Sequence, residues 1–286
     1  MKVVEIEVSD TMWPLDGAPG SLFVGGKTMR ACQEENAPAG EVSLLANAWV
    51  AAVDWELLLG MDGEAKLESH EGEVLAWKGS GGISQEGVVA LASEDSFLVA
   101  YPWDLIGVNE QVLGGLEAGM DLAESGMEVV ESESGLLFVG VGTRVLPGVF
   151  VEGVVVVGRD CKIGPNCYLR GSTAIGDGCH IGQAVEVKNS VIGHRTAVGH
   201  LSYVGDSVLG SRVNFGAGTI TSNLRHDGKN QRSLVGNNLV ETGRRKFGTI
   251  VGDAVHTGIH TAIYPGRKLG PGTMTLPGET VERDKV

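Results

Sequence analysis

An aliphatic residue recurs every six positions through the second half of this 286-residue chain, often with glycine after it. The period begins with Val139, Val145, Val151, Val157, Ile163, Leu169, Ile175, Ile181 and Val187. After two five-residue units and one long interruption it continues through Ile192, Val198, Val204, Leu209, Phe215, Val251, Thr257, Ile263, Leu269, Thr275 and Val281. Each unit holds one short strand and one turn, so three units make a triangular coil with the aliphatic side chains stacked inside. The period therefore predicts an all-β domain, a left-handed parallel β-helix over residues 136–286, with an inserted loop at about 223–248.

Three cysteines share one place in their repeat units, four positions after the aliphatic residue. They are Cys161, Cys167 and Cys179, while Cys32 stands alone in the front half. A shared place in a repeat predicts small side chains that pack inward, rather than metal ligands or disulfides. The cysteines give no sign of an oxidising compartment.

Residues 1–135 lack the six-residue period and predict a smaller α/β domain. MKVVEIEV alternates apolar and polar residues, as a half-buried strand does. Residues 41–60 indicate a strand followed by a helix or a second buried segment, and residues 97–124 indicate a strand, a turn at a proline and an amphipathic helix. The polar, acidic and glycine-rich stretch 61–95 predicts mobile loops or a poorly packed hairpin.

The net charge of −14 is unevenly divided along the chain. Residues 1–135 carry 25 acidic and 5 basic side chains, whereas residues 136–286 carry 11 acidic and 17 basic ones. A basic repeat domain suits small ligands that bear phosphate, because opposite charge concentrates them. The acidic half either disfavours nucleic acid as a partner or serves only to keep an exposed domain soluble.

The chain shows no signal for a membrane or for export. No apolar run approaches the roughly 20 residues that span a bilayer. The start, MKVVEIEVSD, lacks the basic and apolar regions of a signal peptide. These features predict a cytoplasmic protein without a membrane partner.

Polar residues that coil packing does not require gather between Ile192 and Asn223. The run GHLSYVGDSVLGSRVNFGAGTITSN at residues 199–223 resembles the active-site run of one acetyltransferase domain. That domain belongs to the bifunctional N-acetylglucosamine-1-phosphate uridyltransferase family, and the resemblance covers the C-terminal half of the chain. The return from the inserted loop, GRRKFGTIVGD, is similar to that of archaeal-type homologues.

The resemblance implies an acetyl-CoA-dependent N-acetyltransferase that acts on an amino-sugar phosphate such as glucosamine 1-phosphate. It implies no requirement for a metal. It also implies a homotrimer, with ligand sites in the grooves between protomers. His200 matches the general base of the family, and imidazole can take up a proton near neutral pH. Asn214 is the second catalytic candidate.

The remaining site residues also follow from the resemblance. The residues implied to bind substrate are Arg170, Lys188, Tyr203, Asn223, Lys229 and Arg232. Those implied to contact the coenzyme are Ala217, whose N–H is also a candidate oxyanion donor, Ile259, Arg244 and Lys246. The spacing of 18 between Arg170 and Lys188 is one coil, which stacks them on one face.

Other interpretations of these residues remain open. Arg232 stands where a lysine is expected, which changes the geometry of the contact. The two asparagines could instead serve left-handed turns. The basic run that contains Arg244 and Lys246 could meet either coenzyme phosphates or the acidic front domain.

The front half carries a weaker resemblance to the same family. YPWDLIGVNEQVL looks like the segment that joins the nucleotidyltransferase domain to the β-helix, and LFVGGKTMR looks like the stretch after the nucleotide loop. The glycine-rich loop that would cradle phosphates is missing. We therefore expect residues 1–135 to form a truncated, degenerate nucleotidyltransferase-like domain without nucleotidyl transfer.

Three alternatives compete with the acetyltransferase. One is a non-catalytic hexapeptide protein that binds a nucleotide sugar or serves as an assembly subunit, and another is retained nucleotidyl transfer. The third is a zinc site of the γ-carbonic anhydrase kind, which needs a histidine pair separated by four residues. His194 with His200 and His256 with His260 do not have that separation, so no metal is predicted.

Overall fold

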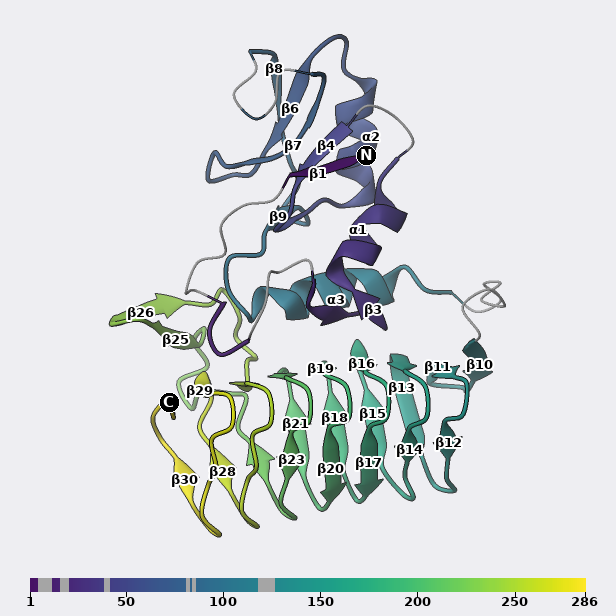
Figure 1. Cartoon of the computed structure of the whole chain (residues 1–286), viewed down its shortest axis with the longest axis vertical. Helices are drawn as coiled ribbons and strands as arrows, with labels where there is room; N and C mark the ends of the chain where they lie inside the picture. The colour runs from purple at the N-terminus through teal and green to yellow at the C-terminus, as the bar shows by residue number, and fades with distance from the viewer. Residues whose placement is uncertain (5–11, 16–20, 39–41, 81–82, 84–85, 118–126) are drawn as a thin grey trace. The chain divides into compact units, whose positions relative to one another are not determined.

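The computed structural model divides the chain into two compact units (Figure 1). The first comprises residues 1–9, 17–22 and 27–100, and the second comprises residues 10–16, 23–26 and 101–286. The structure describes residues 1–4, 12–15, 21–38, 42–80, 83, 86–117 and 127–286. The predicted strand at the N-terminus is described only as β1, since residues 5–8 lie outside the described residues.

The first unit is built on a five-stranded mixed sheet. Its strands lie in the order β1 (Lys2–Val4), β4 (Val42–Leu45), β7 (Val74–Lys78), β6 (Ala65–Glu68) and β8 (Val88–Leu91). The other elements are β3 (Lys27–Thr28), α1 (Met29–Asn36), β5 (Ala48–Trp49), α2 (Ala52–Gly60) and β9 (Phe97–Leu98). The strand and helix predicted for residues 41–60 are thus confirmed as β4, β5 and α2.

The stretch 61–95 differs from its prediction. It forms the antiparallel pair β6–β7 and the parallel pair β6–β8. Leu67, Leu75 and Trp77 from these strands are buried in the core of the unit. The prediction of loops or a poorly packed hairpin was wrong, because Ala65 and Leu67 of β6 and the three consecutive residues 75–77 of β7 are buried within this polar stretch.

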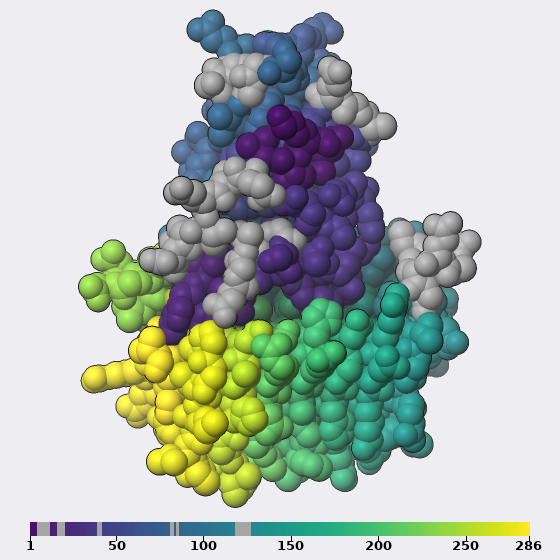
Figure 2. All heavy atoms as spheres, in the orientation of Figure 1, coloured from purple at the N-terminus to yellow at the C-terminus, as the bar shows by residue number. Residues whose placement is uncertain are grey.

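The second unit is a parallel β-solenoid of about eight turns over residues 135–281, which confirms the predicted β-helix. Figure 2 shows its stacked coils as successive bands from teal to yellow. Face 1 comprises β12 (Arg144–Val145), β14 (Lys162–Ile163), β17 (His180–Gln183), β20 (Ala197–His200) and β23 (Asn214–Phe215). Face 2 comprises the start of β13 (Phe150–Val157), β15 (Tyr168–Arg170), β18 (Glu186–Lys188), β21 (Tyr203–Gly205), β24 (Ile220–Thr221), β28 (Ala262–Ile263) and β30 (Thr280–Val281). Face 3 comprises β11 (Gly135–Gly140), the end of β13, β16 (Thr173–Ile175), β19 (Val191–Ile192), β22 (Val208–Leu209), β27 (Thr249–Val251) and β29 (Arg267–Leu269).

The interior of the solenoid follows the six-residue period. Every predicted inward position is at most 8% exposed except Val145, and the three repeat cysteines are buried beside them. Val145 is 42% exposed, against prediction. It lies on β12, the first strand of face 1, which pairs with a neighbour on one side only. Among the described residues, no coil packs beyond it on that face, so its side chain is left open.

Helix α3 (Asp104–Gly114) packs on face 3 against β13, β16 and β19, and confirms the helix predicted after residue 97. The Asn109 amide joins the helix to the solenoid, since it accepts from Gly25 N at 2.9 Å and donates to Ser172 O at 2.8 Å. The short strand β2 (Phe23–Val24) belongs to this unit, and β10 (Met127–Glu131) extends face 3 beside β11. The structure groups α3 with the solenoid, whereas the predicted division near residue 135 follows the start of the repeat.

The inserted loop contains an antiparallel hairpin of β25 (Arg232–Val235) and β26 (Asn238–Glu241). The solenoid resumes at β27, directly after the loop predicted for residues 223–248. None of the described helices combines the length and the apolar character needed to cross a bilayer.

Candidate active site

Two cations stack on face 2 of the solenoid. Strands β15 and β18 pair in parallel, and their register places Arg170 beside Lys188. This confirms the stacking predicted from their spacing. Because neighbouring strands lie about 4.8 Å apart, one phosphate group can reach both side chains.

Tyr203 lies on β21, the next strand along face 2, with its hydroxyl folded over Gly205. A Cβ at Gly205 would lie 2.3 Å from Tyr203 Oη and 2.8 Å from Asn223 Nδ2, so only glycine leaves room for this arrangement. Tyr203 Oη accepts a hydrogen bond of 2.9 Å from Asn223, which leaves the hydroxyl proton for a further acceptor. Burial raises the pKa of Tyr203, and the charges of Asp206 and Glu186 raise it further. The phenol therefore stays a neutral donor near pH 7.

A buried carboxylate connects these side chains. Asp206 is 2% exposed and accepts hydrogen bonds from Lys188 Nζ at 3.2 Å and Asn189 Nδ2 at 3.1 Å. Asn223 Nδ2 donates at 2.5 Å to Asp206 Oδ2, the oxygen that also accepts from Lys188. Since a carboxylate accepts from several donors at once, Asp206 fixes both the Lys188 ammonium and the amide that holds Tyr203.

Helix α3 reaches the same network through Glu110. Asn189 Nδ2 donates to Glu110 Oε1 at 2.7 Å, and Arg244 Nη1 donates to Glu110 Oε2 at 3.3 Å. A second contact joins Arg244 Nη2 to Glu110 Oε1. The Arg244 Nε is buried and has no hydrogen-bond partner within the described part of the chain. Arg244, expected at the coenzyme, thus lies with the candidate substrate residues at the corner between faces 2 and 3.

Each of the three cations faces one carboxylate. Arg170 pairs with Glu186 at 2.7 Å, Lys188 pairs with Asp206 at 3.2 Å, and Arg244 pairs with Glu110. The cationic side chains remain between 22% and 32% exposed. Ion pairs that water still reaches are worth little, so an incoming phosphate can compete with these carboxylates.

The corner between faces 1 and 2 carries His200, Ala217 and Ile259 in one column. Their carbonyl oxygens each accept a backbone hydrogen bond from the next coil, at 3.2, 2.8 and 2.7 Å respectively. The His200 side chain is exposed at the end of β20. Within the described residues, nothing hydrogen-bonds to the imidazole or to the N–H groups of Ala217 and Ile259. This corner therefore presents the His200 imidazole and the unpaired N–H groups of Ala217 and Ile259, with the His260 imidazole beside Gly218.

One short strand separates this corner from the cations. His200 precedes Tyr203 by three residues, and Lys188 is in register with Gly205 at the far end of β21. At about 3.3 Å per residue, Tyr203 and Gly205 lie about 7 Å apart. A ligand with an amine at one end and a phosphate at the other can span that width.

The other predicted site residues lie outside this arrangement. Asn214 is exposed on face 1, where it pairs with Ala197. Lys229, Arg232 and Lys246 are exposed on the inserted loop. Arg232 Nε lies 3.8 Å from Glu241 across the β25–β26 hairpin. Among the described residues, no hydrogen bond or ion pair joins these four to His200 or Lys188. Lys246 pairs with Leu224, next to Asn223 of the network.

Sequence analysis missed three members of the network. Asp206 and Asn189 occupy corner positions with positive φ, at 49° and 46°, where short polar residues usually serve the backbone alone. The sequence signals for these two residues were their places: Asp206 closely follows Tyr203, and Asn189 directly follows Lys188. No sequence signal marked Glu110, because it lies 79 and 134 residues from its partners Asn189 and Arg244.

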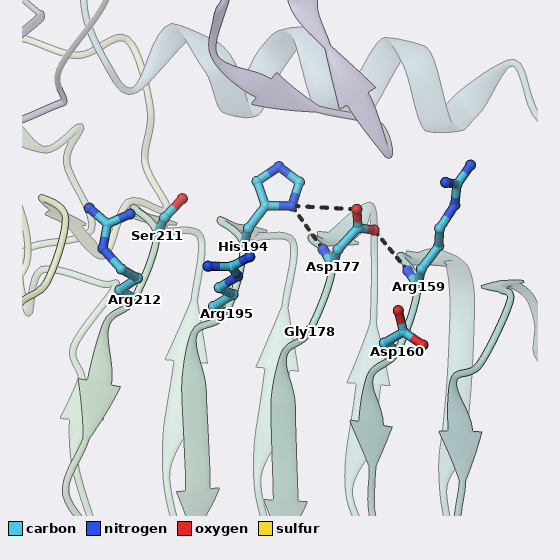
Figure 3. A pocket seen from close by; sticks show the side chains of 8 residues that line it. All are labelled: Arg159, Asp160, Asp177, Gly178, His194, Arg195, Ser211 and Arg212. Carbon is cyan, nitrogen blue, oxygen red and sulfur yellow. Dashed lines mark hydrogen bonds and ion pairs between the residues drawn. The ribbon is translucent and has the colours of Figure 1, made fainter.

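A second groove follows the corner between faces 3 and 1 (Figure 3). Asp177 N donates to His194 Nδ1 at 2.9 Å, and Asp177 Oδ1 accepts from Arg159 N at 2.8 Å. The groove, of about 630 Å³, is lined by Arg159, Asp160, Asp177, Gly178, His194, Arg195, Ser211 and Arg212. Asp160, Asp177 and the Arg212 partner Asp253 lie beside its three arginines.

The histidines form no metal centre in the described part of the chain, where no three His, Cys, Asp or Glu side chains are grouped to hold an ion. His194 lies at the corner between faces 3 and 1, and His200 lies at the corner between faces 1 and 2. Burial lowers the pKa of His180, and the charges of Lys162 and His200 lower it further. The site therefore offers acid–base groups and cations from its own side chains.

Comparison with known proteins gives matches that centre on the solenoid. Residues 135–269 match the family profile of the GMPPB C-terminal domain. A bifunctional sugar-1-phosphate nucleotidylyltransferase/acetyltransferase from Sulfurisphaera tokodaii is 39% identical over 186 residues, which is 65% of this chain and 46% of that protein. The bifunctional protein GlmU of Methanococcus maripaludis is 36% identical over 186 residues, 65% of this chain and 44% of that protein. This chain thus spans about half the length of the curated relatives it matches.

Among solved structures, a mutant of AntD is similar to 59% of this chain. AntD is an N-acyltransferase from Bacillus cereus, crystallised with dTDP-4-amino-4,6-dideoxyglucose and coenzyme A. The similarity covers 80% of the AntD chain at 16% identity, with a TM-score of 0.25. A TM-score this low carries no argument about function. The sequence relatives are informative, because their names agree with the family that the sequence resembles. The C-terminal two thirds of this chain is related to the bifunctional sugar-1-phosphate nucleotidylyltransferase/acetyltransferases.

Proposed function

We propose that this protein is an acetyl-CoA-dependent N-acetyltransferase whose acceptor is an amino-sugar phosphate. One observation carries the proposal: face 2 has the His200 imidazole at one edge, and three cations with the Tyr203 hydroxyl at the other. An amino-sugar phosphate has an amine and a phosphate that match these two edges. The related bifunctional nucleotidylyltransferase/acetyltransferases support the same chemistry.

His200 is the general base in this proposal. It takes a proton from the amine as the nitrogen attacks the thioester carbonyl, so a C–N bond forms and the C–S bond breaks. The proton then passes to the departing coenzyme thiolate. The unpaired N–H of Ala217, in the same column, donates to the oxyanion of the intermediate.

The sugar phosphate lies across face 2. Lys188 and Arg170 bind the phosphate, and Tyr203 donates its free proton to the phosphate or to a sugar hydroxyl. We assign Arg244 to the same phosphate rather than to the coenzyme, since it meets Lys188 through Glu110, Asn189 and Asp206. The coenzyme then lies along the corner column beside Ala217 and Ile259.

The chain is proposed to act as a homotrimer, with the site in a groove between protomers. Such a groove would bring the exposed Asn214, Lys229, Arg232 and Lys246 to a substrate or coenzyme bound mainly by the neighbouring protomer. We further propose that the protein acts in the cytoplasm.

Thiol release from acetyl-CoA tests this function directly. The assay compares glucosamine 1-phosphate and galactosamine 1-phosphate with the corresponding free amino sugars. We expect release that depends on an amine, and a lower KM for the phosphorylated acceptors. Binding of these ligands without any thiol release would instead favour a non-catalytic binding protein.

A further inference from the structure

An open groove of about 350 Å³ lies on face 2, on the coils before Tyr203. It is lined mainly by Gly148, Phe150, Asn166, Tyr168 and Glu186. Phe150 is 55% exposed, and its ring meets the edge of Tyr168 with centroids 5.5 Å apart and planes at 63°. An exposed phenyl ring beside a second aromatic ring offers an apolar surface on an otherwise polar face.

The register of face 2 leads from this groove to the proposed sugar site. Phe150 pairs with Tyr168, Tyr168 with Glu186, and Glu186 with Tyr203. With coils about 4.8 Å apart, Phe150 lies about 14 Å from Tyr203 along the solenoid axis. The groove is therefore an extension of the proposed site.

Arg170 lies at both the aromatic groove and the proposed sugar site. Its guanidinium lies 5.2 Å from the centroid of the Tyr168 ring, and the same side chain stacks beside Lys188. A phosphate bound by Arg170 would have Lys188 on one side and the aromatic groove on the other. Three cations in this cluster also exceed what one phosphate monoester needs, and suit a diphosphate.

The chemistry of the groove fits a nucleoside. Exposed aromatic side chains stack on bases with little regard to their identity. Carboxylates accept hydrogen bonds from ribose hydroxyls. Glu186 and Glu152 supply carboxylates at this groove, where Glu152 accepts from the Tyr168 hydroxyl and Glu186 from Arg170.

We infer that the acceptor is an amino sugar carried on a nucleoside diphosphate, with its base on Phe150 and its diphosphate at Arg170 and Lys188. This inference rests on the proposed function, since it uses the same places for the amine and the sugar. It adds a subsite that a simple sugar phosphate leaves empty.

Binding of UDP and GDP, compared with pyrophosphate, tests the subsite without need of catalysis. We expect the wild-type protein to bind at least one nucleoside diphosphate more tightly than pyrophosphate in calorimetric titration. Phe150→Ala should weaken nucleoside diphosphate binding by roughly 5- to 100-fold, the range for loss of an aromatic stacking partner, and leave pyrophosphate unchanged. Phe150→Tyr should retain the preference. Tyr264→Ala, at an exposed aromatic on a C-terminal coil, is the matched control and should also retain it.

Three results would overturn the subsite while leaving acetyl transfer in place. One is equal binding of pyrophosphate and both nucleoside diphosphates. Another is a ratio of kcat/KM for UDP-glucosamine over glucosamine 1-phosphate that Phe150→Ala does not change. A lower oligomeric mass of Phe150→Ala in light scattering would also overturn it, since a second copy would then cover the ring. If no amine acceptor is acetylated but Phe150→Ala still loses UDP or GDP, the proposed function fails and the nucleoside subsite stands.

Discussion

Asp206 shows how one side chain can organise several others. Its carboxylate accepts from Lys188, Asn189 and Asn223 while almost fully buried. Removal of its charge leaves buried donors without an acceptor, which is more costly than the hydrogen bonds themselves are worth. Asp206 is therefore a positioning residue for the phosphate-binding lysine and for Tyr203.

Asp206→Asn should raise KM for the phosphorylated acceptor more than it lowers kcat. It should also reduce the free energy of unfolding by about 1–3 kcal/mol, because the amide has one acceptor oxygen for three donors. Steady-state kinetics and urea unfolding measure the two effects. Asp160→Asn is the control, since Asp160 has a similar positive φ of 54° at the corner between faces 3 and 1. Equal effects at both positions would mean that Asp206 serves its turn and not the site.

Individual coils depend on the aliphatic residues that define the period. Ile181 on β17 is fully buried in the core column, whereas Val145 on β12 is 42% exposed at the open end. Ile181→Ala should lower the free energy of unfolding by about 2–5 kcal/mol, since it removes buried methyl groups and leaves a cavity. Val145→Ala should change it by less than about 0.5 kcal/mol. Chemical denaturation of both variants checks this, and a large loss at Val145 would show that something covers the first coil.

Of the helix α3 residues described above, Glu110 alone contacts the site. Glu110→Gln should free the Arg244 guanidinium and lower KM for phosphorylated acceptors. Stability should fall by less than about 1 kcal/mol, since both side chains are partly exposed. Glu117→Gln, at an exposed glutamate beyond the helix, is the control. An unchanged KM in Glu110→Gln would remove Arg244 from the phosphate site.

The elements differ in how far sequence could predict them. The coils were predictable because a one-dimensional stack needs an inward aliphatic residue at a fixed period. The pair of Arg170 and Lys188 followed from that same period, since their spacing of 18 residues is one coil. The exposure of Val145 on the first strand of face 1 could not be predicted from the period. A period of inward residues does not show what covers the end of the stack.

Long-range polar contacts were beyond the sequence for a different reason. Glu110 meets its partners only because α3 packs on face 3, and nothing near residue 110 marks that contact.

In the first unit, Leu67 and Trp77 were hidden within an acidic stretch whose composition suggested loops. The acidic composition of that stretch predicted exposed side chains. The side of the sheet that each side chain faces decided which of them are buried.

At the scale of the whole molecule, the account requires association of several chains. Asn214 and the inserted-loop residues Lys229 and Arg232 lie away from His200 in one chain. We therefore expect a trimer in multi-angle light scattering at micromolar concentration. Association through the solenoid should persist in a chain that lacks residues 1–100, provided the shortened chain still folds by circular dichroism. A monomer at that concentration would remove the groove in which these residues act.

The central claim is that His200 removes the proton from the attacking amine. Single-turnover thiol release from acetyl-CoA, with a saturating amino-sugar phosphate, measures that step directly. His200→Ala should slow it by roughly 10² to 10⁴, the usual contribution of a positioned general base, and leave coenzyme affinity nearly unchanged. His70→Ala, at an exposed histidine of the first unit, should react at the wild-type rate. A wild-type rate for His200→Ala would contradict the account.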